Sequence, residues 1–199
     1  MAFDYDLIVL GSGPAGQRAA VQAAKLGKRV AIVERQRMVG GVCLHTGTVP
    51  SKTFREAVLS LTRVPALAHG VPVERPRPTI RDLLHRVHLV VERALEVVAR
   101  QLARHAVDLV SGTASFVDPH MVSVAAQGAG SARTLTAADI LIAVGSVPAP
   151  PPVENDHRTI LTSDDILTLD ELPRTMAVIG GGVIGIEYAS MFARLGVEV

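Results

Sequence analysis

Short apolar runs alternate with a helical stretch at the start of the chain. Residues 5–10 and 29–34 are nearly continuous apolar runs, which are typical of parallel strands buried on both faces. Between them, residues 14–26 place several alanines on one face of a helix, and Gly27 ends it. This strand–helix–strand order predicts a crossover unit within a parallel sheet.

Two further helices are predicted in the middle of the chain. Residues 51–61 and 80–105 have apolar side chains at helical spacing, and the longer segment has one continuous apolar stripe. The proline-rich residues 71–78 between them predict a loop. Four β-rich pieces follow at residues 107–112, 120–126, 133–137 and 139–145.

The pattern of the N-terminal unit returns after an extended, proline-rich linker at residues 147–155. Residues 175–199 again read as strand, glycine turn, helix and the start of a strand. We therefore predict an α/β fold in two parts. Residues 1–150 form a dinucleotide-binding domain with a helical insertion at about 50–105, and residues 151–199 form the linker and the truncated start of a second such domain.

Composition narrows the class of protein. The 199 residues are 48% hydrophobic and carry a formal net charge of +1. This charge gives no strong electrostatic attraction to nucleic acid or to a membrane surface. One cysteine excludes an internal disulfide framework and suits a reducing compartment. The N-terminus lacks the features of a signal peptide, and no apolar run reaches the roughly 18 residues of a membrane span. We expect a soluble, cytoplasmic protein.

The first candidate site is the glycine turn GSGPAG. Gly11 permits the tight turn, Gly13 lets the backbone approach a pyrophosphate, and Gly16 lets helix and strand pack closely. Glu34, at the end of the next strand, has the spacing of a carboxylate that binds a ribose hydroxyl. This context predicts dinucleotide binding; the alternative is a glycine-rich turn that serves packing alone.

The second candidate site is the turn GGGVIG near the C-terminus. Gly180, Gly182 and Gly185 repeat the spacing of the first turn, and Glu187 is expected in the first turn of the helix, where a carboxylate suits the helix dipole. The residue that would select NAD or NADP falls past Val199.

The third candidate is the segment that holds the single cysteine. Thr48 and Pro50 suit a helix start, which places Lys52 in the first turn, where a cation opposes the dipole by roughly 0.3–1 kcal/mol. This mismatch favours a functional Lys52 over a merely solvated one. Cys43 is either a small buried hydrophobe or, paired with His45, a reactive thiol.

Other catalytic classes have weak support. His85 and His88 lie three residues apart on the long predicted helix, but no carboxylate or third ligand accompanies them, so surface histidines are the better interpretation and no metal is expected. Neither a G-x-S-x-G elbow nor a Walker lysine occurs in the sequence.

Two dinucleotide turns around a helical insertion resemble the pyridine nucleotide–disulfide oxidoreductases over essentially the whole chain. In the disulfide reductases of that family, such as dihydrolipoamide dehydrogenase, the matching motif has two cysteines, whereas here the second position is Thr48. The run GTVPSK after the cysteine, together with GIEYASMF, looks like the branch of soluble, Si-specific pyridine-nucleotide transhydrogenases, which lacks that disulfide.

The resemblance implies a role for each matching residue. Glu34 would bind the adenosine ribose, and Lys52 would pair with Glu187 near the flavin as the catalytic pair. Val144 replaces the threonine of the family's Ala-Thr-Gly-Ser turn, which puts that hydrogen bond in doubt. The residues implied in binding FAD are Gly11, Gly13, Pro14, Ala15, Gly16, Glu34, Arg35, Gln36, Arg37, Met38, Val39, Gly40, Gly41, Val42, Cys43, Gly47, Thr48, Lys52, Gly112, Thr113, Ala114, Ala143, Val144, Gly145 and Ser146. Those implied in binding NAD(P)H are Gly180, Gly182, Ile184 and Gly185.

The resemblance implies a Rossmann-like FAD domain of three-layer ββα character and the beginning of an NAD(P) domain. The implied activity is hydride transfer between NADPH and NAD⁺ through FAD, without a redox disulfide, in a full-length parent that forms a homo-oligomer. Two alternatives stay open at this point: a disulfide reductase similar to dihydrolipoamide dehydrogenase, and a non-catalytic FAD-binding fragment.

Overall fold

The computed structural model describes residues 3–36, 39–62, 79–126, 131–149 and 153–199. The chain divides into two compact units. Unit 1 comprises Met1–His45 and Glu92–Val147, and unit 2 comprises Thr46–Val91 and Pro148–Val199. The predicted boundary near residue 150 separates an FAD-binding domain from an NAD(P)-binding domain, and it stays a prediction.

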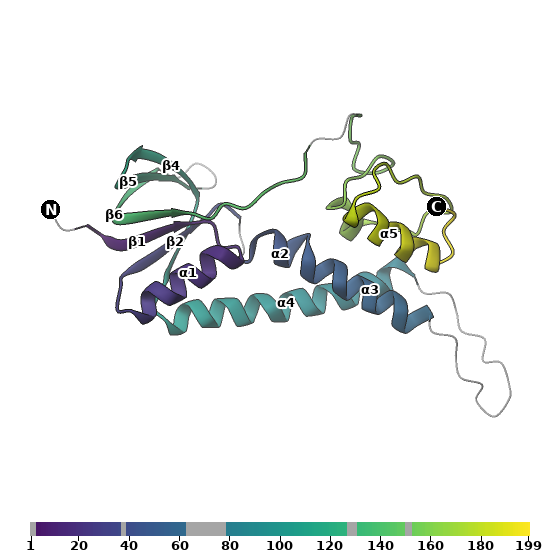
Figure 1. The fold of residues 1–199 in the computed structure, drawn as a ribbon, viewed down its shortest axis with the longest axis horizontal. Coiled ribbons are helices and arrows are strands. Elements are labelled where there is room, and N and C mark those ends of the chain that lie inside the picture. The colour runs from purple at the N-terminus through teal and green to yellow at the C-terminus, as the bar shows by residue number, and fades with distance from the viewer. Residues whose placement is uncertain (1–2, 37–38, 63–78, 127–130, 150–152) are drawn as a thin grey trace, which may run out of the picture. The chain divides into compact units, whose positions relative to one another are not determined.

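Unit 1 is built on a six-stranded sheet with the order β3-β2-β1-β6-β5-β4. The strands are β1 (Tyr5–Leu10), β2 (Val30–Glu34), β3 (Asp108–Ser111), β4 (Thr113–Asp118), β5 (Met121–Ala125) and β6 (Arg133–Ile142). Strands β3, β2, β1 and β6 pair in parallel with one another. Strand β5 pairs antiparallel with β6 on one side and with β4 on the other. Helix α1 (Pro14–Lys25) connects β1 to β2, as the apolar pattern predicts (Figure 1).

Alternation along β1 explains how unit 1 is layered. Ile8 and Leu10 face one core, which they share with Val122 and Val124 of β5. Val9 faces a second core with α1 and the C-terminal part of α4 (Ile80–Arg104). The parallel strands therefore lie between an antiparallel layer and a helical layer, which confirms the predicted three-layer α/β fold.

Two strand predictions in unit 1 need correction. The pieces at 133–137 and 139–145 are one strand, β6, whose start pairs with β5 and whose end pairs with β1. Strand β4 was not predicted, because it is an edge strand with mostly exposed side chains and so has no apolar alternation.

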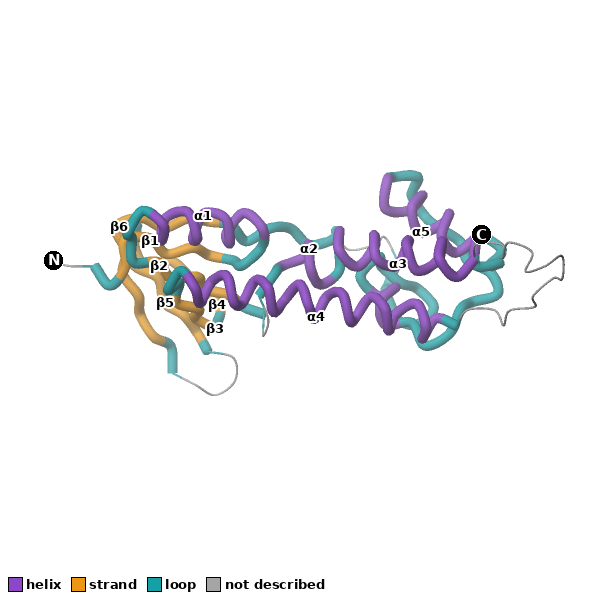
Figure 2. The backbone as a smooth tube through the Cα atoms, turned by 90° about the horizontal axis from the view of Figure 1, so that it is seen from below, coloured by secondary structure: helices purple, strands orange, loops and turns teal. Residues whose placement is uncertain are grey.

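Unit 2 is held together by a helical core. Helix α3 (Thr48–Thr62), the N-terminal part of α4 and helix α5 (Val183–Arg194) contribute the buried apolar side chains, and the rings of Phe54 and Phe192 stack with centroids 6.0 Å apart. Figure 2 shows α3 and α5 side by side in unit 2. The remaining described helices are the short α2 (Gly41–His45), which belongs to unit 1, and the 3₁₀ turn η1 (Asp165–Thr168).

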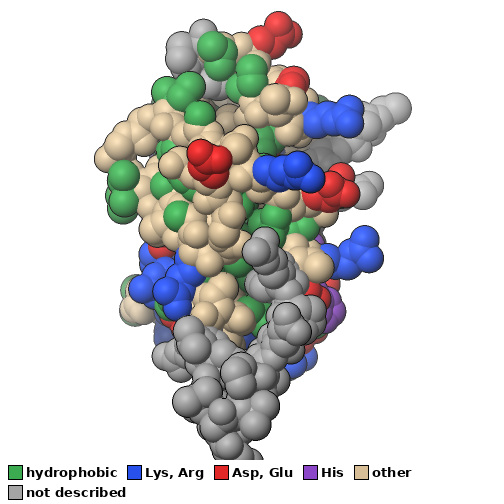
Figure 3. Space-filling view, turned by 90° about the vertical axis from the view of Figure 1, so that its right-hand side faces the viewer, with side chains coloured by type: hydrophobic (Ala, Val, Ile, Leu, Met, Phe, Trp, Pro, Cys, Tyr) green, Lys and Arg blue, Asp and Glu red, His purple; other side chains and the backbone are tan. Residues whose placement is uncertain are grey.

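The strand predicted before α5 does not form. A single parallel bridge joins Thr175 to Glu198, and residues 176–179 have no regular secondary structure. Ile179 in this segment and Val183 at the start of α5 are 84% and 83% exposed. The face drawn in Figure 3 shows hydrophobic side chains at the surface. The sequence predicted a strand from apolar content, but a parallel strand also needs hydrogen-bonded partners on its edges.

Candidate functional site

The first glycine turn, between β1 and α1, has the geometry that its spacing predicts. Gly11 has φ of +102°, and a Cβ there would lie 2.4 Å from the carbonyl oxygen of Ala143. A Cβ at Gly16 would lie 2.0 Å from the carbonyl oxygen of Gly11. Both positions therefore require glycine, one for the turn and one for the packing of α1 on β1.

The second turn, between residue 179 and α5, repeats this geometry in unit 2. Gly180 has φ of +111°, and a Cβ at Gly185 would lie 2.4 Å from the carbonyl oxygen of Gly180. The helix N-caps match as well, with φ and ψ of −66° and 177° at Gly13 and −75° and 172° at Gly182. The internal repeat seen in the sequence is therefore a repeat of backbone conformation.

The middle glycine of each turn faces open space. A Cβ at Gly13 or Gly182 would meet nothing within 4 Å. Neither N-cap residue has a side chain that caps its helix, and neither helix has an acidic residue in its first turn. The amide groups at both helix starts are thus available to an anion, as a dinucleotide pyrophosphate requires.

Glu34 anchors the first turn through its buried carboxylate. Its Oε2 accepts hydrogen bonds from the backbone amide of Ser12, at 2.8 Å, and from the Ser12 hydroxyl. Its Oε1 accepts from the amide of Gln36 at 2.9 Å. Burial works to raise the pKa of the Glu34 carboxyl, but the hydrogen bonds from the Ser12 side chain and from nearby amides outweigh it and lower that pKa.

Ser12 links three segments of the site and was not among the predicted residues. Its hydroxyl also accepts a hydrogen bond from the amide of Gly40 at 3.0 Å, and its carbonyl accepts from the side chain of Gln17 at 2.6 Å. The only signal in the sequence is a small hydroxyl residue between the first two glycines. The connection of β1, β2 and the cysteine segment thus depends on one fully buried serine.

The other predicted FAD residues of unit 1 gather at the carboxyl ends of the parallel strands. The amide of Gly112 donates to the carbonyl of Glu34 at 2.9 Å, and the amide of Ala143 donates to that of Leu10 at 2.8 Å. The segments from Gly112 to Ala114 and from Ala143 to Ser146 therefore flank the first glycine turn. Ligands of open α/β sheets bind at this edge.

The cysteine segment packs against the same turn. A Cβ at Gly41, where φ is +60°, would lie 2.9 Å from the Cα of Gly13. Cys43 is a free thiol in α2 and is partly exposed, which differs from a fully buried hydrophobe. The ring of His45 lies 3.0 Å from the carbonyl oxygen of Val39, so it is engaged with the backbone. The predicted residues Arg37 and Met38 lie outside the described residues.

Lys52 and Glu187 form an ion pair within unit 2. The Nζ of Lys52 lies 2.6 Å from the Oε1 of Glu187, which joins α3 to α5. Both residues lie in the second turn of their helices, not the first as predicted, because α3 begins at Thr48 and α5 at Val183. The helix dipole therefore acts only weakly on the charge of either side chain, since its electrostatic effect falls off beyond the first turn.

We expect this pair to contribute little to stability. The Lys52 side chain is 63% exposed, so solvent screens the interaction, and a double-mutant cycle of Lys52→Ala and Glu187→Ala should give a coupling below about 1 kcal/mol. The exposed pair of Arg100 and Glu96 on α4 is the matched control, with a similar coupling expected. Urea unfolding of the four variants measures both, and a coupling above about 2 kcal/mol would show a structural pair.

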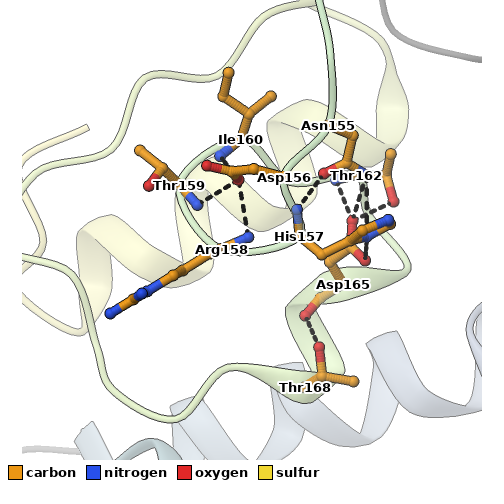
Figure 4. A network of polar contacts seen from close by, with 9 residues as sticks. All are labelled: Asn155, Asp156, His157, Arg158, Thr159, Ile160, Thr162, Asp165 and Thr168. Atoms are coloured by element: carbon orange, nitrogen blue, oxygen red, sulfur yellow. Dashed lines mark hydrogen bonds and ion pairs between the residues drawn. The ribbon is translucent and has the colours of Figure 1, made fainter.

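A second polar cluster fixes the segment that leads into the second glycine turn (Figure 4). Asp165 accepts hydrogen bonds from the amide and hydroxyl of Thr162, from Asn155, and from the ring of His157 at 2.8 Å. Burial opposes ionisation of Asp165, but these bonds lower its pKa on balance. This cluster was not predicted from the sequence, although Thr162 followed three residues later by Asp165 is a capping signal.

Asp156 closes the neighbouring turn (Figure 4). Its Oδ1 accepts from the backbone amides of Arg158, Thr159 and Ile160 at 2.7–2.9 Å. The bond from the Ile160 amide is the largest cause that lowers the pKa of Asp156 to about 2. Both clusters are structural, since their acceptors are occupied by the chain itself.

Tyr188 has a buried hydroxyl without a hydrogen-bond partner among the described residues. Burial raises its pKa to about 12. Tyr188→Phe should therefore stabilise unit 2 by about 1 kcal/mol, because it removes an unsatisfied polar group and keeps the ring beside Phe54. Tyr5→Phe is the control with the opposite sign, since the Tyr5 hydroxyl donates to Asp108 at 3.0 Å. Thermal unfolding measures both variants, and a less stable Tyr188→Phe would show that the hydroxyl has a partner.

Metal-ligating groups and membrane-spanning helices are both absent from the described residues. No group of three His, Cys, Asp or Glu side chains there could hold a metal ion. His85 and His88 are exposed on α4. Within the same residues, no helix combines the length and apolarity needed to cross a membrane.

Curated proteins match almost the whole length of this chain. The soluble pyridine nucleotide transhydrogenase of Mycobacterium bovis is 52% identical over 199 residues, which cover 98% of this chain and 42% of the relative. That of Hahella chejuensis is 41% identical and is covered to 43%. The chain thus spans less than half the length of these relatives.

Solved structures of similar fold include the HOCl-induced flavoprotein disulfide reductase RclA of Escherichia coli. It has a TM-score of 0.77 and 30% identity over 96% of this chain and 40% of its own. The Cu(II) complex of its C43S mutant has a TM-score of 0.82 and 28% identity, with 98% and 41% covered. The family described as pyridine nucleotide-disulphide oxidoreductase matches residues 5–199. The predicted fold class and the resemblance are thereby confirmed, and the chain belongs to the pyridine nucleotide-disulphide oxidoreductase family.

Proposed function

We propose that this chain is the FAD-binding part, with the start of the NAD(P)-binding part, of a flavoprotein that transfers hydride between NADPH and NAD⁺. The family and the flavoprotein neighbours indicate FAD as the cofactor and NAD(P)H as a substrate. The observation that carries the proposal is the repeated glycine turn, since two dinucleotides need two such turns.

The residues of the first turn fit an FAD pyrophosphate. The open space at Gly13 would admit the phosphates, and the uncapped amides of α1 would donate to them. Glu34 would bind the adenosine ribose. Its Oε2 already accepts two hydrogen bonds from Ser12, so ribose contact would use its remaining lone pairs or displace the Ser12 hydroxyl.

The second turn fits the pyrophosphate of a nicotinamide nucleotide in the same way. Gly182 faces open space at the start of α5, and Gly180 and Gly185 make the turn around it. We propose that Gly180, Gly182, Ile184 and Gly185 begin this site. When bound, the flavin would accept hydride from one nicotinamide and return it to another.

The remaining residues would position the cofactor. Lys52 would present its ammonium to the flavin, and the carboxylate of Glu187 would hold that ammonium at 2.6 Å in its orientation. Gly47 and Thr48, at the start of α3, would line the same ring system. Because the pair adds little to stability, Lys52→Ala should slow flavin reduction by NADPH much more than it lowers the unfolding free energy.

The single cysteine separates this proposal from a disulfide reductase. Cys43 is the only cysteine of the sequence, and Thr48 stands where the disulfide reductases of the family have their second. One sulfur cannot cycle as an intramolecular disulfide, so electrons that reach the flavin would leave to a soluble acceptor. A disulfide reductase remains the second enzymatic candidate, and a non-catalytic FAD-binding fragment is the third.

The proposed activity also implies substrates, a location and an oligomeric state. We propose NADPH and NAD⁺ as the two small-molecule substrates, a cytoplasmic location, no nucleic-acid or membrane partner, and a homo-oligomer for the full-length parent. A net charge of +1 and an aromatic content of only 3% support the exclusion of nucleic acid.

The direct test is to purify the chain, record its visible spectrum, and add NADPH with a thionicotinamide analogue of NAD⁺. Flavin bands followed by reduction of the analogue support the proposal. Absence of flavin bands, with FAD supplied, contradicts FAD binding by this chain. Bound flavin without hydride transfer identifies the non-catalytic fragment.

A further inference from the structure

Ser12 is a fully buried serine inside the first glycine turn. It is 0% exposed, whereas Glu34 and Ser51, the other buried residues with short polar or charged side chains among those described, are 7% and 8% exposed. A buried hydroxyl is costly unless hydrogen bonds replace those it made to water. The bonds of Ser12 therefore indicate what a hydroxyl does at this position.

The hydroxyl of Ser12 joins two separate segments. It donates to the Oε2 of Glu34, at the end of β2, and it accepts from the backbone amide of Gly40 at 3.0 Å. A serine hydroxyl has a single proton, so the bond to Glu34 uses that donor and leaves the oxygen lone pairs to Gly40. The orientation of the hydroxyl is thus fixed from both sides.

The backbone of Ser12 is held independently of this hydroxyl. Its amide donates to the Oε2 of Glu34 at 2.8 Å, and its carbonyl accepts from the side chain of Gln17 at 2.6 Å. The Oε1 of Glu34 also accepts from the amide of Gln36. Without the hydroxyl, the turn and Glu34 would therefore keep these contacts. The amide of Gly40 would keep only its longer bond, to the Ser12 carbonyl at 3.2 Å.

The segment held at Gly40 borders the space proposed for the FAD pyrophosphate. Gly41 follows at the start of α2, and a Cβ there would lie 2.9 Å from the Cα of Gly13. A Cβ at Gly13 itself would meet nothing within 4 Å. The backbone of Gly41 therefore lies directly beside the open position at Gly13. A displacement of this backbone would change the fit of an anion at the start of α1.

We propose that Ser12 is a positioning residue of the FAD site, whose hydroxyl holds the backbone at Gly40 and Gly41 against the first glycine turn and so fixes the space for the pyrophosphate. This inference rests on the proposed function, since it requires FAD at that turn. The Ser12 side chain would not touch the cofactor, because it is buried and engaged on both sides. A ribose would then bind the remaining lone pairs of Glu34, because displacing the hydroxyl would also release Gly40.

The link to Gly40 is tested without any nucleotide, by hydrogen exchange of the full chain followed by NMR. In Ser12→Ala the Gly40 amide should exchange about threefold to tenfold faster, as expected for the loss of one buried hydrogen bond. Ser12→Thr keeps the hydroxyl and should stay within about twofold of the parent chain. Ser12→Cys, kept reduced, preserves the approximate size but has only a weak donor and acceptor, so it should resemble Ser12→Ala.

Ser51→Ala is the matched control for loss of a buried hydroxyl. Ser51 lies in α3 and its hydroxyl donates to the carbonyl of Thr48 in the same helix at 3.4 Å, so its removal should leave the exchange of Gly40 unchanged. If packing volume were what matters at Ser12, Ser12→Cys would behave as the parent chain and Ser12→Thr would not. That order, or unchanged exchange of Gly40 in Ser12→Ala, would overturn the inference.

The effect on the cofactor site is tested by calorimetric titration with FAD and with ADP, which share the pyrophosphate. Both should bind Ser12→Ala about threefold to tenfold more weakly than the parent chain, by similar factors, and Ser12→Thr should restore both affinities. Circular dichroism verifies folding, and Ser12→Cys carries the same comparison if Ser12→Ala does not fold. Equal affinities in Ser12→Ala and the parent chain, or a loss confined to FAD, would overturn the inference and leave the proposed function standing. A parent chain that binds neither nucleotide would contradict the proposed function itself, and this role with it.

Discussion

Gly16→Ala should destabilise unit 1 by at least about 2–3 kcal/mol. The added methyl group would lie 2.0 Å from the carbonyl oxygen of Gly11, a backbone atom that cannot move without breaking the turn. Helix propensity alone favours alanine over glycine by roughly 0.5–1 kcal/mol, so a loss has to come from this contact. Urea unfolding followed by circular dichroism measures the effect.

Gly13→Ala is the matched control in the same turn. Its φ of −66° suits any residue, and a Cβ there meets nothing within 4 Å. The stability should therefore change by less than about 0.5 kcal/mol. FAD affinity should fall, because the methyl group occupies the space proposed for the pyrophosphate. If Gly16→Ala unfolds at the same urea concentration as the parent chain, the close packing described for this turn is wrong.

The second turn offers an independent repetition in unit 2. Gly185→Ala places a methyl group 2.4 Å from the carbonyl oxygen of Gly180, whereas Gly182→Ala meets open space. We expect the same contrast: a stability loss for Gly185→Ala and almost none for Gly182→Ala. The reverse order would mean that the two turns differ in spite of their matching dihedral angles.

Glu34→Gln should cost unit 1 roughly 2–3 kcal/mol. Both carboxylate oxygens accept from N–H or O–H donors, so an amide nitrogen at either position would face another donor. Glu92→Gln, an exposed residue of α4, is the control and should change the unfolding free energy by less than about 0.5 kcal/mol. Equal stability of the two variants would show that the contacts of Glu34 with Ser12 carry no weight.

The lowered pKa of Glu34 predicts how the free energy of unfolding depends on pH. Because the pKa of Glu34 is lowered in the folded state from its ordinary value of 4.5, its contribution to stability is complete above that value. The contribution is lost as the pH falls through the lower, folded-state pKa. Acid unfolding curves of the parent chain and Glu34→Gln should therefore converge at low pH, and curves that stay parallel would contradict this account.

The local sequence pattern was sufficient to predict an element where the residues that form the element are also the ones that are buried. The apolar run of β1 and the stripe of α4 predict their elements because the same residues fill the core. The glycine spacing predicts both turns because positive φ and close backbone approach require glycine there. Strand β4 was not predicted because an edge strand buries few apolar side chains. The segment before α5 was predicted as a strand because its residues are apolar, but only one bridge forms there.

Candidate site residues were easier to predict than the contacts between them. Spacing pointed to Glu34, yet the role of Ser12 as its partner depends on the approach of β1 and β2, which no local pattern encodes. The pairing of Lys52 with Glu187 came from resemblance, because 135 residues separate them in the chain. Their true helix positions required the bounds of α3 and α5.

The central claim is that this flavoprotein part works with FAD and without a redox disulfide. An anaerobic reductive titration of the FAD-loaded chain tests it most directly, with Cys43→Ser in parallel. Each FAD takes up two electrons, and because the chain has one cysteine, only a disulfide between two chains could form, which would add one electron per FAD. Two electrons per FAD are therefore expected in both proteins. Three electrons per FAD in the parent chain, falling to two in Cys43→Ser, would contradict the claim.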